Sequence, residues 1–145
     1  METILVADDA PDILDLARDI LTAAGYAVLT ATNGEEAQRA ADRHPGPIHA
    51  LLADVVMPKL TGPQLADRLV RSRGDMKVIF MSGYTAEITG QYGLVPSGSP
   101  FVGKPFTPEQ LLGKLREALE YRLPFARPAS AVPSPAAMGL ARKAG

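Results

Sequence analysis

Residues 48–58 read IHALLADVVMP, and this stretch decides the fold. An apolar run from Ile48 to Ala53 ends in Asp54, and the chain turns at Pro58. A short, continuous apolar run is typical of a strand that is buried on both faces of a parallel sheet. Asp54 therefore stands at the end of a buried strand, where its carboxylate reaches the rim of the sheet.

Three other apolar runs end in polar residues in the same way. Ligands bind outside the carboxyl ends of the strands in an open parallel sheet, so we expect these polar side chains to converge with Asp54. Acids, a hydroxyl and a lysine in one place suit a divalent cation and a phosphoryl group. The residues are Asp8 and Asp9 after run 4–7, Ser82 after run 78–81, and Lys104 after run 101–103.

The chain alternates short apolar runs with amphipathic helical segments, which predicts one α/β domain built on a five-stranded parallel sheet. The third helix is expected to turn Leu65, Leu69 and Val70 inward. Between the last two strands, residues 86–99 are rich in glycine and serine and support only a turn or two of crossover helix. The expected strands are 3–7, 26–31, 48–53, 76–81 and 100–102, and the expected helices are 11–24, 35–44, one that starts at 61 or 62, and 107–121.

The composition sets the environment of the chain. Its 145 residues carry 15 basic and 16 acidic side chains, a balance that argues neither for nor against nucleic acid. We expect no direct nucleic-acid partner, because the basic residues of the C-terminal tail are few and scattered. The absence of cysteine excludes disulfides and thiolate metal sites. No stretch is apolar enough for a membrane span, and the N-terminus does not read as a leader. We therefore expect a soluble, cytoplasmic domain.

The acids at the strand ends predict a metal site. Asp8, Asp9 and Asp54 cannot all stay ionised within a few ångströms unless a cation joins them, because like charges raise each other's pKa. Ligands that are all oxygen favour a hard ion, Mg²⁺ or Mn²⁺. Beside such an ion, the Asp54 carboxylate could attack phosphorus and form an acyl phosphate, with Lys104 and the Ser82 hydroxyl on the phosphoryl oxygens.

Four motifs and one glycine, in this order, resemble the receiver domains of two-component response regulators, over nearly all of residues 3–121. The resemblance implies strand order 2-1-3-4-5 in a flavodoxin-like fold. The sequence around Ser82 and Lys104 is most similar to receivers of hybrid sensor histidine kinases. The motifs are ILVADD (4–9), LADVVMP (52–58) with Gly62, MSGY (81–84) and FVGKPF (101–106).

The resemblance also implies a role for each residue of the site. Asp54 is the phosphoacceptor, which takes its phosphoryl group from a histidine kinase or phosphotransfer protein. The domain then catalyses only its own phosphorylation and dephosphorylation, and it signals to a downstream protein or to a parent multidomain kinase. The implied metal ligands are Asp9, Asp54 and the Val56 carbonyl, with Asp8 acting mostly through water. The implied phosphoryl-binding residues are Ser82, Gly83 and Lys104. The implied switch pair is Ser82 and Phe101, and the Lys104–Pro105 peptide bond is expected to be cis.

Some positions depart from the family pattern. Val56 is apolar and Tyr84 is aromatic at two positions that face the hydrolytic water, so both are expected to tune the phosphoryl lifetime. The interrupted 86–99 segment makes dimerisation through a helix there less favourable, and we expect a monomer or weak dimer. We assign residues 1–123 to the receiver domain and 124–145, rich in proline and alanine, to a disordered tail.

Other functions fit the same residues less well. Asp8 and Asp9 could be a helix cap before Pro11. A magnesium-dependent phosphatase with an aspartyl nucleophile would need an acid at Val56, two residues after the nucleophile. A dinucleotide-binding domain would need a glycine-rich loop after the first strand, where this chain has none. A receiver-like docking domain that works without phosphate is the remaining alternative.

Overall fold

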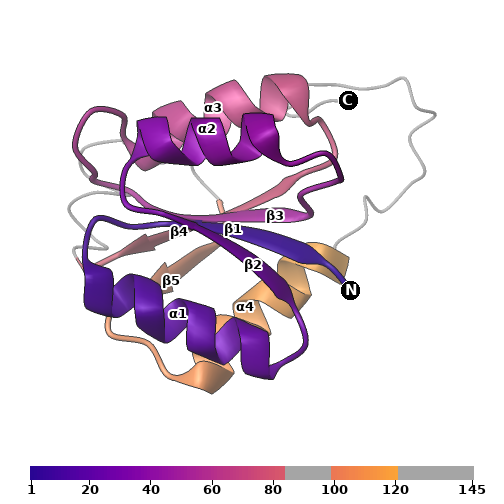
Figure 1. The fold of residues 1–145 in the computed structure, drawn as a ribbon. Helices are drawn as coiled ribbons and strands as arrows, with labels where there is room; N and C mark the ends of the chain where they lie inside the picture. The colour runs from indigo at the N-terminus through magenta and orange to yellow at the C-terminus, as the bar shows by residue number, and fades with distance from the viewer. Residues whose placement is uncertain (84–98, 121–145) are drawn as a thin grey trace.

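The computed structural model describes residues 1–83 and 99–120 of the chain. Five parallel strands form one sheet in the order β2-β1-β3-β4-β5, as the resemblance implied. Helices α2 and α3 cover one face of the sheet and α1 and α4 cover the other (Figure 1). The strands are β1 (Thr3–Ala7), β2 (Ala27–Ala31), β3 (Ala50–Asp54), β4 (Lys77–Ser82) and β5 (Phe101–Gly103); the helices are α1 (Pro11–Ala23), α2 (Gly34–Arg43), α3 (Gly62–Ser72) and α4 (Pro108–Glu120).

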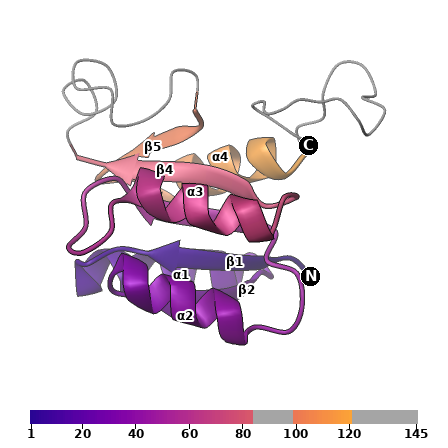
Figure 2. The same cartoon turned by 90° about the horizontal axis from the view of Figure 1, so that it is seen from above.

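Apart from residues at their ends, the central strands are apolar, because both of their faces are covered. In β1, Leu5 and Ala7 pack toward α2 and α3, whereas Ile4 and Val6 pack toward α1 and α4. Every residue of β1 and β3 is buried. Alternate side chains of one strand thus enter two different cores, which explains why the sequence shows continuous runs and no alternation. Figure 2 shows α2 and α3 together on the near side of the sheet.

Local capping signals set the helix boundaries. The Thr61 side chain accepts a hydrogen bond from the Gln64 backbone, and the Gln64 side chain accepts one from the Thr61 backbone, so α3 begins with a capping box. Thr107 and Gln110 form the same reciprocal pair at the start of α4. After α1, Gly25 has φ of +99°, a conformation that glycine adopts without steric cost.

The structure corrects a few of the expected positions. Val70 is exposed and does not face the core, because it follows Leu69 by one residue and is rotated about 100° away from the buried side of α3. The second helix begins at Gly34 and not at Glu35, and several strands shift by one or two residues. The expected short helix within 86–99 and the tail 124–145 lie outside the described residues, apart from Ser99.

None of the helices within 1–83 and 99–120 is long and apolar enough to cross a membrane.

Candidate phosphoacceptor and metal site

Asp54 ends β3 at the carboxyl edge of the sheet, beside the end of β4. Its partner in the strand register is Met81, and the next backbone amide, of Val55, donates to the Met81 carbonyl. The residue is only 8% exposed, although it is an acid. Pairing with β4 therefore fixes the Asp54 backbone and leaves the carboxyl group at the rim.

Asp8 and Asp9 follow β1, which lies next to β3. Asp8 is completely buried, and its Oδ1 accepts a hydrogen bond from the Ala10 backbone at 2.9 Å. Asp9 is exposed. The helix-cap interpretation fails here, because Ala10 is the N-cap residue of α1 and no side chain caps it. The two acids instead face the site at the end of the sheet.

Lys104 brings a single positive charge to these acids. Its Nζ lies 2.9 Å from Oδ2 of Asp8 and 3.4 Å from Oδ1 of Asp54. Burial opposes the charged form of this lysine, but the hydrogen bond to Asp8 and the charges of Asp54 and Asp8 prevail and raise the pKa of Lys104. The peptide bond between Lys104 and Pro105 is cis, the isomer that the resemblance implies.

The acids outnumber this cation. The pKa of Asp54 is raised from 3.8 to about 6: burial contributes most, the charge of Asp8 adds to it, and Lys104 only partly offsets both. The Asp54 carboxylate is thus held where its negative charge is poorly stabilised by the protein alone. A further positive charge at this edge would stabilise it.

The three acids are placed to hold such a charge. Asp8, Asp9 and Asp54 each offer a carboxylate oxygen, and these oxygens lie within 4.8 Å of one another. Oxygen ligands at this spacing fit a hard divalent cation such as Mg²⁺. The arrangement unites residues that are up to 46 positions apart in the sequence, as the strand ends predicted.

The other predicted residues border the same edge. Ser82 is buried, and its carbonyl accepts a hydrogen bond from the Lys104 backbone at 3.0 Å. Gly83 follows it and is exposed. Phe101 is half-buried against the core under α2 and α3. Val56 is 52% exposed, an open position for an apolar side chain. Tyr84 lies outside the described residues.

Gly62 supports the site in a way that the sequence did not predict. A Cβ atom on Gly62 would lie 2.4 Å from the Asp54 carbonyl oxygen, well inside van der Waals contact. The Gly62 amide also donates to the Val55 carbonyl at 2.9 Å. Only glycine lets the start of α3 approach the Asp54 backbone this closely. The signal in the sequence was a glycine at the start of a helix, at a position where no positive φ requires one.

A model of the response regulator receiver domain matches residues 4–116. The chain belongs to the response regulator receiver domains. The match includes the acids, Ser82 and Lys104, and the receiver fold explains why these residues meet at one edge of the sheet. The chain is therefore a receiver domain of two-component signalling, with an aspartate cluster at the expected place.

Comparison with individual relatives and solved structures shows how similar the chain is to known receivers. It is 31% identical to the response regulator GtcR of Aneurinibacillus migulanus over 127 residues, which cover 88% of this chain and 51% of GtcR. The chain thus spans about half the length of the curated relatives it matches. Among solved structures, the receiver of the hybrid histidine kinase CckA is 32% identical with a TM-score of 0.69, and covers 81% of this chain and 99% of its own. The response regulator TrrA of Thermotoga maritima, solved in complex with Mg²⁺ and BeF, is 28% identical with a TM-score of 0.68 over 81% of this chain and 99% of its own.

Proposed function

We propose that Asp54 is the phosphoacceptor of this receiver. The observation that carries the proposal is the contact of Lys104 with both Asp8 and Asp54 within a cluster of three acids. Asp8 is also buried and lies closer to Lys104, but both of its oxygens already accept hydrogen bonds, whereas Asp54 ends the central strand β3. An oxygen of its carboxylate would attack the phosphorus of the donor, the bond from phosphorus to the donor would break, and the leaving group would keep that electron pair.

Mg²⁺ or Mn²⁺ would be held by Asp9, Asp54 and the Val56 carbonyl. Both oxygens of Asp8 already accept hydrogen bonds, from Ala10 and Lys104, which favours contact of Asp8 with the ion through water. When bound, the ion supplies positive charge that keeps Asp54 ionised and neutralises the phosphoryl oxygens. TrrA, a relative of this chain, was solved with Mg²⁺ and BeF, which supports this assignment.

The remaining residues would bind the phosphoryl group and respond to it. The Lys104 ammonium would move from Asp8 toward the phosphoryl oxygens, which develop charge during transfer. Ser82 and Gly83 would donate to another oxygen, and Phe101 would turn inward behind Ser82. Phe101 is only half-buried, so its side chain would become more buried when it turns inward. Val56 and Tyr84 would set the lifetime of the phosphorylated state.

We infer that the phosphoryl donor is a histidine kinase or a phosphotransfer protein. The chain would catalyse only its own phosphorylation and dephosphorylation, and no other substrate would turn over. The output would pass to a protein partner or to a parent multidomain kinase. Val56 stands where a phosphatase would need its second acid, and its side chain is apolar and exposed, which disfavours that alternative.

Phosphorylation with a small donor tests the proposal. The chain is incubated with acetyl phosphate or phosphoramidate, with and without Mg²⁺, and its intact mass is measured. We expect one phosphate adduct that requires Mg²⁺ and is absent in Asp54→Ala. The matched control is Asp12→Ala, an exposed acid on α1, which should be labelled like the wild type. An adduct that survives in Asp54→Ala would disprove the assignment, and a folded, Mg²⁺-binding chain without any adduct would favour a docking domain that works without phosphate.

A further inference from the structure

The seam between α1 and α4 contains apolar side chains that the receiver site does not use. Leu16 on α1 is 40% exposed, although it lies one turn from Ile13 and Ile20. Those two side chains pack in the core cluster that also contains Leu111 and Leu115 of α4. Residues three and four apart share one side of a helix, so Leu16 lies on the side of α1 that packs with α4.

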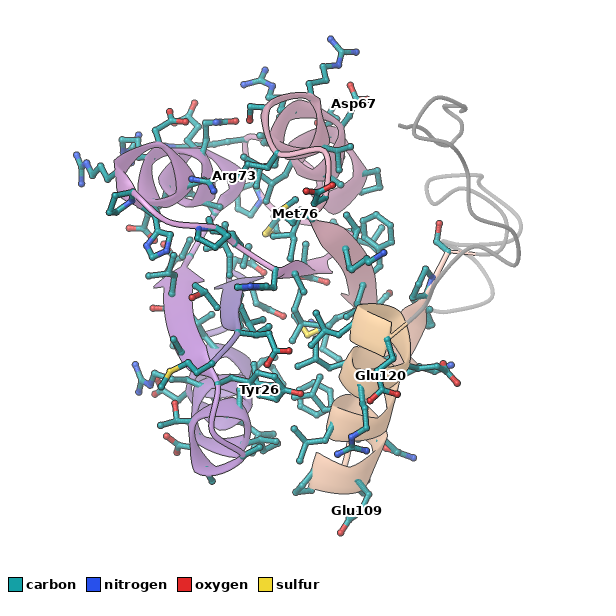
Figure 3. The ribbon with its side chains drawn as sticks, turned by 90° about the vertical axis from the view of Figure 1, so that its right-hand side faces the viewer. Tyr26, Asp67, Arg73, Met76, Glu109 and Glu120 are labelled. Atoms are coloured by element: carbon teal, nitrogen blue, oxygen red, sulfur yellow. The ribbon has the colours of Figure 1, made fainter. Side chains whose placement is uncertain are left out.

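Leucines of α4 complete this seam. Leu112 and Leu119 are only partly buried against the same core. The opposite side of α4, with Gln110 and Lys114, lines a hollow beside β5, so the two leucines face the other way, toward α1. Figure 3 shows Tyr26 between α1 and α4, and Tyr26 is also partly buried on this core.

The α1 side of the seam is acidic, although α4 carries the exposed Arg116 on its side of the seam. Asp12, Asp15 and Asp19 are exposed on α1, and the same helix carries one basic residue, Arg18, which pairs with Asp15 at 2.9 Å. The wider surface has the same sign: residues 1–120 contain 11 basic against 16 acidic residues, a net charge of −5. A ligand for this seam should therefore be apolar and positively charged.

The sequence directly after α4 has this composition. Residues 121–145 contain no acid and four basic residues, Arg122, Arg127, Arg142 and Lys143. Between the first two stand Leu123 and Phe125. The segment therefore begins with two apolar side chains flanked by two guanidinium groups.

We propose that residues 121–127 dock into the α1–α4 seam of the same chain. Leu123 and Phe125 cover the partly exposed leucines, while Arg122 and Arg127 pair with the acidic rim of α1. Seven extended residues span about 23 Å, enough to follow α1, whose 13 residues extend about 20 Å. The tether also gives the segment an effective concentration of about 1 mM, so a weak contact would still be populated.

A spin label tests the contact directly, because the chain has no cysteine. Ala126→Cys is labelled with a nitroxide, and the loss of amide NMR signals is measured in the otherwise unchanged full chain. We expect broadening of residues 12–16, in the half of α1 distant from the end of α4, and much less in α2 and α3 on the other face of the sheet. Equal, weak broadening of all four helices would show a freely moving tail and would overturn the proposal.

Two double charge reversals test whether the arginines near α4 hold the segment on α1. Adding Arg122→Glu and Arg127→Glu to the labelled chain should reduce the broadening of α1 several-fold. The matched pair Arg142→Glu and Lys143→Glu changes the net charge equally and should leave the broadening unchanged; an equal loss in both pairs would overturn the docking.

A mixture of labelled chain with unlabelled ¹⁵N chain should show no broadening, and broadening in it would assign the contact to a second copy instead.

Discussion

The two edges of the sheet each hold one cation that joins distant segments, but they are built differently. At the amino edge, the Arg73 guanidinium donates to three carbonyls, of Ala41, His44 and Gly46, at 2.8–3.0 Å. Figure 3 shows Arg73 between α2 and α3. At the carboxyl edge, Lys104 faces two carboxylates of a group of three.

The difference lies in how the charge is balanced. Arg73 closes the end of α2, where free carbonyls and the helix dipole favour a cation, and its hydrogen bonds complete that end. Lys104 does not offset the burial of Asp54 and the negative charge of Asp8 beside it, so the pKa of Asp54 stays raised at about 6. The amino edge is complete as folded, whereas the carboxyl edge would gain stability from a bound cation. Functional sites commonly sacrifice stability in this way.

The largest expected effect comes from the carboxyl edge. Gly62→Ala should destabilise the fold by about 3 kcal/mol, because its Cβ would meet the Asp54 carbonyl at 2.4 Å and backbone cannot move aside cheaply. Gly113→Ala is the matched control: its Cβ would meet nothing within 4 Å, and a helix-interior alanine should stabilise by about 0.5–1 kcal/mol. Urea unfolding measures both. Equal stabilities for the two variants would contradict the close approach of α3 to Asp54.

Arg73→Ala breaks the amino edge. We expect a loss of about 2–3 kcal/mol, because three partly buried carbonyls lose a charged donor. Phosphorylation of Asp54 should be unchanged at a temperature where the variant is folded, since the two edges are independent. Arg68→Ala, an exposed arginine on the same helix, should change stability by less than about 0.5 kcal/mol. If Arg73→Ala behaved like Arg68→Ala, the guanidinium would have no structural role.

Asp54→Asn sharpens the comparison by removing the unbalanced charge. Without metal, the folded chain binds more protons than the unfolded chain between pH 4 and 6, because folding raises the pKa of Asp54 from 3.8 to about 6. Wild-type stability should therefore fall as the pH rises through this window, by about 2 kcal/mol once partial solvent screening is allowed for. Asp54→Asn should lack this fall and be more stable at pH 7. Parallel pH profiles for the two proteins would show that Asp54 carries no such penalty.

The smallest expected effect is the recovery of stability by metal. Mg²⁺ at ten times its dissociation constant should stabilise the wild type by about 1.4 kcal/mol, since it binds only the folded chain. Asp9→Asn should weaken this response, and Asp12→Asn, one turn along the chain and outside the acid cluster, should retain it. Thermal unfolding with and without Mg²⁺ measures both. A full response in Asp9→Asn would remove Asp9 from the ligands.

Much of the site could be predicted because strand ends carry local signals. An apolar run that stops at an acid indicates both a buried strand and a rim residue, and this logic located Asp8, Asp54, Ser82 and Lys104. The Arg73 contacts left no such signal, since they join carbonyls 27–32 residues away and any residue supplies a carbonyl. The expectation that Val70 faces the core was wrong. In the sequence, an apolar residue next to the buried side of a helix cannot be told from an apolar residue on that side.

The local sequence was enough to predict the order of strands and helices along the chain, the helix cap at Thr107 and the residues that end the strands, because each depends on neighbours in the chain. Only the tertiary structure decided how those residues meet: that Lys104 lies closer to Asp8 than to Asp54, that Asp8 is buried while Asp9 is exposed, and that Gly62 touches the Asp54 backbone. Distances and burial of this kind arise when the packing of two cores fixes the sheet. The charge balance that makes one edge functional and the other structural is therefore a property of the folded chain.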